Sequence, residues 1–214
     1  MKKELESLLI ELEIAYSKSS ISEMCEREGV KWGYGLVTTS LKPHRPLFLG
    51  FNWGAGSGTD FQNQVTIETD SFLKQDLGSF QRIVPYCKKY LNENELAEAS
   101  QSNFCFFRSK SESQICSSDI QLCEPIFNRL LSVLKPSMVL AFSGKLRSYL
   151  IDRGFVKNIR SKEILFKRGS SDITYRVQKG LLKGDVEIFF LPHPNYPMSK
   201  EARKQTWDYC FKSV

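Results

Sequence analysis

Residues 46–51 read Pro-Leu-Phe-Leu-Gly-Phe, an apolar run that leads directly into Asn-Trp-Gly-Ala-Gly-Ser-Gly at 52–58. Three further apolar runs follow along the chain, at 102–107, 138–142 and 186–191. Nearly continuous apolar runs of this length are typical of strands in a parallel sheet that is covered on both faces. We therefore expect these four segments to form a central, mostly parallel, four-stranded sheet.

Helical patterns lie between the predicted strands, at 70–91, 119–134 and 144–153. Strands that alternate with helices predict a three-layer α/β/α sandwich with right-handed connections. Leucines at helical spacing predict a further helix near the N-terminus, at about 3–16. One segment breaks the alternation: near 162–177, two strand-like runs flank a Gly-Ser-Ser-Asp turn, which predicts a β-hairpin insertion.

The 214 residues, 41% of them hydrophobic, suit a single domain over 1–214. No apolar run approaches the about 20 residues of a membrane span. The N-terminal stretch mixes acids with leucines and lacks the apolar core of a secretory signal. We therefore expect no membrane association and a cytoplasmic location. Six cysteines without a CxxC pair predict reduced, buried thiols, and we expect no metal and no cofactor.

The net charge of +6 is distributed unevenly along the chain. Residues 1–100 carry 11 Lys or Arg against 14 Asp or Glu, whereas residues 101–214 carry 19 against 10. A basic half favours a polyanionic partner, most commonly nucleic acid. A solvated basic surface without any partner explains the charge equally well.

Polar segments follow the predicted strands at the ends where parallel sheets usually carry their chemistry. The glycine-rich stretch 50–58 permits a tight turn and close approach of its backbone to a ligand, with Asn52 near its start. Its spacing fits neither a P-loop nor a dinucleotide fingerprint, and a flexible surface turn is the alternative. Asn103 lies within the second apolar run, where its amide needs either nearby backbone or a ligand as partner.

A histidine between two prolines follows the last predicted strand, in Leu-Pro-His-Pro-Asn-Tyr-Pro at 191–197. Prolines restrict the backbone on both sides of His193, which suits a catalytic group that must keep its aim. A purely structural proline turn is the alternative. Lys200, Arg203 and Lys204 follow on the predicted last helix, and their cations could meet phosphates.

Taken together, these segments resemble the uracil-DNA glycosylase superfamily in order and spacing. The shared features are a glycine-rich loop with Asn52, a second strand with Asn103, the Lys-Pro of 135–136 before the third strand, and the His-Pro of 193–194 before a C-terminal helix. The resemblance covers about residues 44–210. It is nearest in style to the mismatch-specific and single-strand-selective branches.

The resemblance implies a three-layer α/β/α fold and hydrolysis, without a metal, of the N-glycosidic bond of uracil or a related damaged base in DNA. Asn52 would position or activate water, Asn103 would read the pyrimidine edge, and His193 would stabilise charge developing on the uracil carbonyl. The partner would be single- or double-stranded DNA with a flipped base. The further candidates for substrate binding are Gly50, Trp53, Gly54 and Phe61, and those for DNA binding are Pro194, Asn195, Tyr196, Ser199, Lys200, Arg203 and Lys204.

Two departures from the family pattern leave other functions open. Trp53 stands where those branches usually have Pro, and Asn195 stands where the family often has Ser. The N-terminal CxxC of members that carry an iron–sulfur cluster is absent, so we expect no cluster. The alternatives are a catalytically inactive member that binds nucleic acid or a nucleotide, and an unrelated α/β protein whose His-Pro motif is accidental. A monomer is the favoured oligomeric state.

Overall fold

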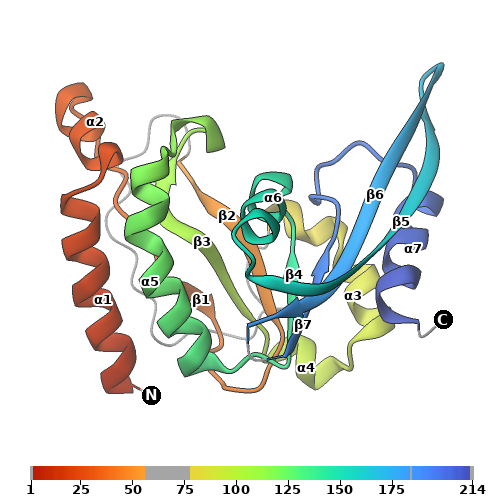
Figure 1. Cartoon of the computed structure of the whole chain (residues 1–214), viewed down its shortest axis with the longest axis horizontal. Coiled ribbons are helices and arrows are strands. Elements are labelled where there is room, and N and C mark those ends of the chain that lie inside the picture. The colour runs from red at the N-terminus through yellow and green to blue at the C-terminus, as the bar shows by residue number, and fades with distance from the viewer. Residues whose placement is uncertain (1, 56–77, 184, 213–214) are drawn as a thin grey trace.

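The computed structural model describes residues 2–55, 78–183 and 185–212 (Figure 1). Its helices are α1 (Lys2–Ser17), α2 (Ser20–Glu28), α3 (Val84–Tyr90), α4 (Glu93–Ala97), α5 (Ser117–Leu134), α6 (Gly144–Asp152) and α7 (Lys200–Phe211), with the 3-10 helices η2 (Gly78–Arg82) and η3 (Glu112–Gln114). Its strands are β1 (Val37–Thr39), β2 (Leu47–Gly54), β3 (Ser100–Ser109), β4 (Met138–Ala141), β5 (Val156–Arg168), β6 (Ser171–Leu182) and β7 (Val186–Phe190). Within these residues, no helix has the length and apolarity that a membrane crossing requires.

One mixed sheet of seven strands forms the centre of the described structure, in the order β1-β3-β2-β4-β7-β6-β5. The neighbours β3, β2, β4 and β7 are parallel, and they contain the four apolar runs of the sequence. The predicted α/β class is confirmed. The predicted extent of four strands is wrong, because β1 pairs with the outer edge of β3 and β6 pairs with the outer edge of β7, both antiparallel.

The β5–β6 hairpin is longer than predicted and belongs to the sheet. It spans 156–182 instead of 162–177, because residues 178–182 of β6 pair with β7 and continue the ladder. Residues 171–177 of β6 pair with β5 alone. Since β6 runs antiparallel to β7, this free part of the hairpin extends past the C-terminal end of β7, by about 24 Å at the usual rise of a strand.

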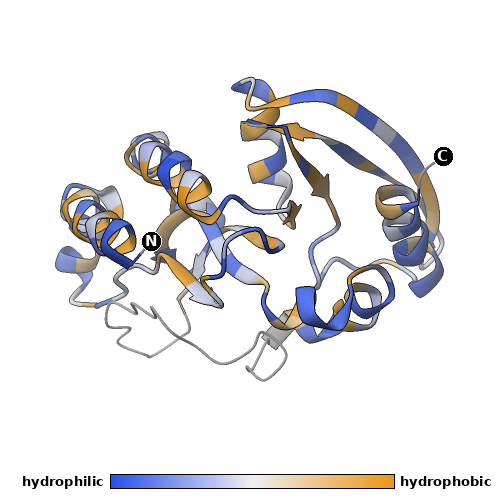
Figure 2. Ribbon diagram, turned by 90° about the horizontal axis from the view of Figure 1, so that it is seen from below, coloured by the Kyte–Doolittle hydropathy of each residue, from blue (hydrophilic) through white to orange (hydrophobic). Residues whose placement is uncertain are grey.

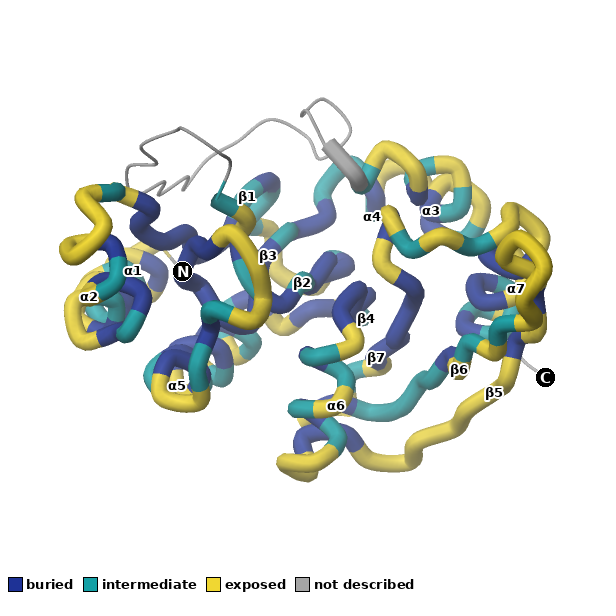
Figure 3. Tube along the Cα trace, turned by 90° about the horizontal axis from the view of Figure 1, so that it is seen from above, coloured by how far each residue is buried: buried dark blue, intermediate teal, exposed yellow. Residues whose placement is uncertain are grey.

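Helices lie on both faces of the parallel strands (Figures 1 and 2). Leu47, Leu49 and Phe51 of β2 pack into a core cluster shared with α1 and α5. Phe48 faces the other way, into a second cluster that includes Trp207 of α7. The run is apolar throughout because each side of the strand meets a helical layer. Figure 3 shows the parallel strands as the most deeply buried part of the chain.

Four of the predicted helices are confirmed, as α1, α5, α6 and the last helix α7. Of the predicted helix 70–91, residues 70–77 lie outside the described residues. The remainder forms η2 and then α3, because Pro85 stands in the first turn of α3, where a missing N–H costs no helical hydrogen bond.

Candidate functional site

The carboxyl ends of β3, β2, β4 and β7 meet at one edge of the sheet, because these strands are parallel. In register, Gly50 of β2 lies beside Asn103 of β3. The same row continues across the sheet, where the Phe142 N–H donates to the Leu49 carbonyl and the Leu191 N–H donates to the Ala141 carbonyl. We call this end of the sheet the carboxyl edge.

Asn52 and His193 each lie two residues beyond this row, on β2 and after β7. Residues two apart in a strand point to the same face, and neighbouring strands are about 4.8 Å apart. Only β4 separates β2 from β7 in the sheet. The structure thus places Asn52, Asn103 and His193 at the same carboxyl edge, on β2, on β3 and after β7.

Asn103 is a buried residue, and its amide lies directly against the backbone of β2. Its residue is 6% exposed. A Cβ atom at Gly50 would stand 2.1 Å from Asn103 Oδ1, so the amide occupies space that only glycine leaves open. Within the described residues, the amide has no hydrogen-bond partner. The amide atoms of Asn103 are not among the fully buried polar atoms that lack a partner, so solvent or a ligand can reach them.

The Asn52 side chain is fixed by two hydrogen bonds at the end of β2. Its Nδ2 donates to Ser109 Oγ at 2.7 Å and to the Trp53 carbonyl at 2.9 Å. A bulge between Asn52 and Trp53 shifts the register against β3 and turns the strand end. These bonds engage the nitrogen of the amide, which leaves Oδ1 as the acceptor that a water molecule could use.

The His193 ring is held in a defined tautomer. The backbone N–H of Asn195 donates to Nδ1 at 3.1 Å, so Nδ1 is an acceptor and the proton of the neutral ring is on Nε2. Burial lowers the pKa of His193 below its ordinary value of 6.5, against the raising effect of the Glu112 carboxylate and together with the lowering effect of Arg203. At neutral pH the ring is therefore uncharged and offers Nε2–H as a donor, although the residue keeps exposed surface.

Arg203 has a different role from the predicted contact with DNA. It is 6% exposed, and its guanidinium donates to the carbonyls of Pro192, His193, Pro194 and Tyr196 at 2.7–3.4 Å. A guanidinium presents five donors in a rigid planar fork, which suits it to gathering several carbonyls. Arg203 therefore holds the loop that carries His193.

Trp53 is also committed to packing. Its indole Nε1 donates to the Gly35 carbonyl at 2.5 Å, and the Arg108 guanidinium lies 5.8 Å from its ring centre. Arg108 in turn donates to the Gly54 carbonyl at 3.2 Å. The indole therefore holds the end of β2 against Gly35, and it does not line the space above Gly50.

The remaining predicted residues divide between surface and packing. Tyr196 packs its ring against Tyr175 and Phe166 of the hairpin, with centroids 5.4 and 6.4 Å away. Ser199 caps α7 by accepting from the Ala202 N–H at 3.2 Å. The residues with exposed side chains are Asn195, Lys200 and Lys204, and Pro194 is buried. The predicted stacking residue Phe61 lies outside the described residues.

An aromatic group that the sequence did not single out lies next to the candidate site. The ring of Phe80 packs edge-on against Phe142 at 5.3 Å and Phe48 at 6.1 Å, on the face of the sheet that Gly50 shares. Phe80 is half-buried, so part of its ring faces outward. No local pattern marks it, because η2 reaches this face only through the tertiary fold.

A carboxylate that the sequence did not single out also lies at the carboxyl edge. Glu112 Oε1 accepts from Ser143 Oγ at 3.0 Å, and the Glu112 backbone carbonyl accepts from Lys145 Nζ at 2.7 Å. The backbone next to Glu112 is connected to Asn52 by hydrogen bonds. Asn52 Nδ2 donates to Ser109 Oγ, which donates to the carbonyl of Ser111, the residue before Glu112, at 2.7 Å. In the sequence, the only indication of Glu112 is the polar stretch that directly follows the second strand.

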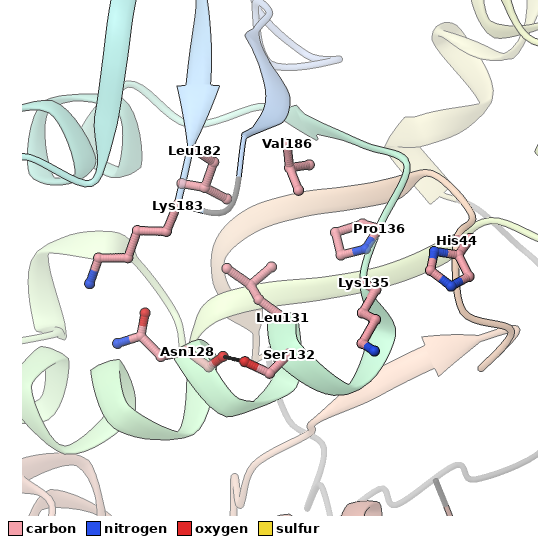
Figure 4. A pocket seen from close by; sticks show the side chains of 9 residues that line it. All are labelled: His44, Asn128, Leu131, Ser132, Lys135, Pro136, Leu182, Lys183 and Val186. Carbon is pink, nitrogen blue, oxygen red and sulfur yellow. Dashed lines mark hydrogen bonds between the residues drawn. The ribbon is translucent and has the colours of Figure 1, made fainter.

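The cavity shown in Figure 4, of about 710 Å³, lies at the opposite end of the sheet. Pro136 precedes β4 and Val186 begins β7, so this cavity adjoins the amino ends of the parallel strands. Lys135, Lys183 and His44 stand around its rim. It shares no residue with the carboxyl edge. Among the residues described, no three His, Cys, Asp or Glu side chains are placed to hold a metal ion.

Replacing Gly50 with Ala should displace the Asn103 amide while leaving the fold intact. The new methyl group would meet the end of a side chain, which can rotate away, so we expect a loss of unfolding free energy of no more than about 1 kcal/mol. The side-chain NH2 signals of Asn103 in a ¹⁵N NMR spectrum should shift. Gly54→Ala is the control, because a Cβ there meets no atom within 4 Å. Unmoved Asn103 signals in Gly50→Ala would contradict the described packing.

The ring of His193 should titrate below pH 6.5. Because the folded chain binds this proton more weakly than the unfolded chain, the stability that neutral His193 contributes is complete above pH 6.5. It is lost as the pH falls through the lowered value. NMR titration of the imidazole Cε1–H signals measures this, with His44→Asn used to assign the two histidines. A midpoint above 6.5 for His193 would contradict the assigned tautomer and burial.

Comparison with known families adds no relative to this picture: neither the protein-family models nor the curated proteins contain a match to the chain.

Proposed function

We propose that this chain is a DNA glycosylase of the uracil-DNA glycosylase type, which hydrolyses the N-glycosidic bond of uracil or a related damaged base in DNA. The carrying observation is the Asn103 amide over Gly50, which bonds to no other described residue and which a ligand can reach, at the same edge as a neutral His193. In this proposal β3, β2, β4 and β7 are the four-stranded glycosylase core. β1 and the hairpin are additions to it.

The Asn103 amide supports recognition of a pyrimidine edge. A carboxamide offers one acceptor oxygen and two donor hydrogens, which complement the N–H and carbonyl of a uracil edge. Its Oδ1 is the atom nearest to Gly50, so β2 limits how the amide can lie. The outward part of the Phe80 ring would offer a surface for stacking of the flipped base.

His193 supports departure of the base. When the bond between N1 of the base and C1′ of the sugar breaks, the electron pair goes to the base and the sugar becomes cationic. A donor held in place at the base carbonyl stabilises the growing negative charge, and such a donor can contribute about 3 kcal/mol to the barrier. The Nε2–H of a neutral ring fits this role, since Asn195 fixes Nδ1 and Arg203 fixes the loop.

Attack by water needs a group that can take up a proton, which the amide of Asn52 cannot do. We assign this role to Glu112, whose carboxylate lies at the same edge and whose charge acts on His193. Asn52 Oδ1 would orient the water, its oxygen would bond to C1′, and Glu112 would accept the released proton. The base recovers a proton from solvent, so the products are the free base and an abasic sugar.

Binding without cleavage is the second candidate function. It is favoured by the identity of Asn52, because an amide is not basic enough to accept a proton from the attacking water. Under this alternative, the carboxyl edge would bind a base in nucleic acid or in a nucleotide, and no base would be released.

His193→Ala should slow base release by about 10²-fold or more under single-turnover conditions, because a donor aimed at the developing oxyanion is lost. DNA affinity should change little, since that donor gains most in the transition state. Uracil-containing oligonucleotides, cleaved with alkali after incubation, measure the release. The control is His44→Asn, at the far end of the sheet, where Asn tolerates the positive φ of 59°. An unchanged rate in a well-folded His193→Ala protein would remove His193 from the mechanism. If the wild-type chain releases no base, the second candidate function, binding without cleavage, remains.

Glu112→Gln should slow base release by about 10²-fold, in the range of general base catalysis. Ser143→Ala removes the hydrogen bond to this carboxylate together with the cap that Ser143 Oγ gives the Leu146 N–H of α6, and it should slow release much less. The matched control is Glu93→Gln, in α4, which precedes the amino end of β3. Equal losses of rate in Glu112→Gln and Ser143→Ala would show a structural role for Glu112.

A further inference from the structure

The positive charge of the chain is concentrated in the β5–β6 hairpin. Residues 156–183 hold eight of the thirty Lys and Arg residues but two of the twenty-four acidic residues. The rest of the chain therefore carries equal numbers of basic and acidic residues, so the whole formal net charge of +6 corresponds to this hairpin.

Most of this charge stands on β5, which is the outermost strand of the sheet. Figure 3 shows β5 exposed along most of its length. Its exposed cations are Lys157, Arg160, Lys162, Lys167 and Arg168. Within the described part of the chain, none of these five forms an ion pair. They span about 35 Å along the strand, at the usual rise per residue.

The other three cations of the hairpin are engaged. Lys179 donates to the Tyr209 and Cys210 carbonyls at the end of α7, at 3.2 and 3.3 Å. Lys183 lies 4.0 Å from the ring centre of Phe155. Arg176 pairs with Glu163 across the two strands at 3.0 Å. The unpaired charge is therefore a single line on the outer strand.

The hairpin also rises beside the candidate site. Its free part, formed by residues 171–177 and their β5 partners, extends beyond the carboxyl edge (Figure 1). Its inner face packs through Phe166 and Tyr175 on Tyr196, in the loop that carries His193. One end of the line of cations thus stands next to the site and the other reaches along the body of the molecule.

We infer that the outer strand β5 is a docking edge for the phosphate backbone of a DNA duplex, placed so that the duplex passes the carboxyl edge. This inference rests on the proposed function for its choice of DNA. The cations follow the curved strand β5 over about 35 Å of its length (Figure 1), which is comparable to one turn of B-DNA, with one phosphate per strand for every about 3.4 Å of its axis. Two apolar side chains of β5, Ile159 and Leu165, are also exposed. They flank Arg160 and Lys162 along the strand.

Lysines on an edge strand have a second known use, because they prevent pairing with another strand. That use predicts a different result from a docking edge. Loss of the cations would then cause association of the chain with itself, and DNA binding would be unchanged.

The test compares two triple variants of the full chain. The ribbon variant is Lys162→Gln, Lys167→Gln and Arg168→Gln. The control is Lys3→Gln, Lys18→Gln and Lys31→Gln, three exposed lysines in or near α1 and α2, which removes the same charge. The probe is a fluorescein-labelled 20-base-pair duplex without any modified base, titrated at several salt concentrations, beside a single strand of the same sequence.

Each phosphate contact contributes about 0.9 to the slope of log affinity against log salt, so the ribbon variant should lose up to about 2.7 of the slope. At low salt its affinity should fall at least about ten-fold, and the control should stay near wild type. Equal slopes for the ribbon variant and the control would overturn the inference. A ribbon variant that aggregates while its slope is unchanged would overturn it in favour of edge protection, and a slope change confined to the single strand would overturn the choice of a duplex.

Uracil release measured on the same preparations separates this inference from the proposed function. If duplex binding is weakened in the ribbon variant but no preparation releases a base, the docking edge is supported and the glycosylase activity is rejected. Base release by a ribbon variant that binds duplex like wild type would reject the docking edge and keep the glycosylase.

Discussion

The shared direction and register of β3, β2, β4 and β7 is the constraint on which the candidate site depends. It brings residues more than a hundred positions apart in the chain to one edge. It also sets Asn103 beside Gly50, where the missing Cβ leaves room for an amide. A shift of one residue between β2 and β3 would turn that amide to the other face of the sheet, because side chains alternate along a strand.

Arg203 shows how the fold supports an exposed catalytic candidate with a buried charge. Burying a guanidinium is costly unless its donors are satisfied, and here four loop carbonyls accept from it. The loop in turn gains a fixed shape without regular secondary structure. His193 can therefore remain at the surface, where a substrate can reach it, while its ring keeps one orientation through Asn195.

The sequence predicted the parts of the fold that depend on local pattern. The four parallel strands and helices α1, α5 and α6 have long apolar periodicities, which tertiary contacts do not override. The extent of the sheet could not be predicted, because β1 has three residues and the base of the hairpin is defined by its pairing with β7. For the site, Asn52, Asn103 and His193 stood out as polar groups at strand ends. Whether a basic residue faces solvent or a loop interior has no trace in sequence, and Arg203 was therefore assigned to DNA.

Tyr196 joins the hairpin to the His193 loop, since its ring contacts Phe166 and Tyr175 on one side and its carbonyl accepts from Arg203 on the other. The ring is a contact between the long hairpin and the loop. Because Tyr196 contacts both parts, a displacement of the hairpin would also displace the loop carbonyls that Arg203 binds, and ordering of the loop would restrict the hairpin. Such coupling is reciprocal by thermodynamic necessity, so grip on a polyanion and order around His193 would rise and fall together.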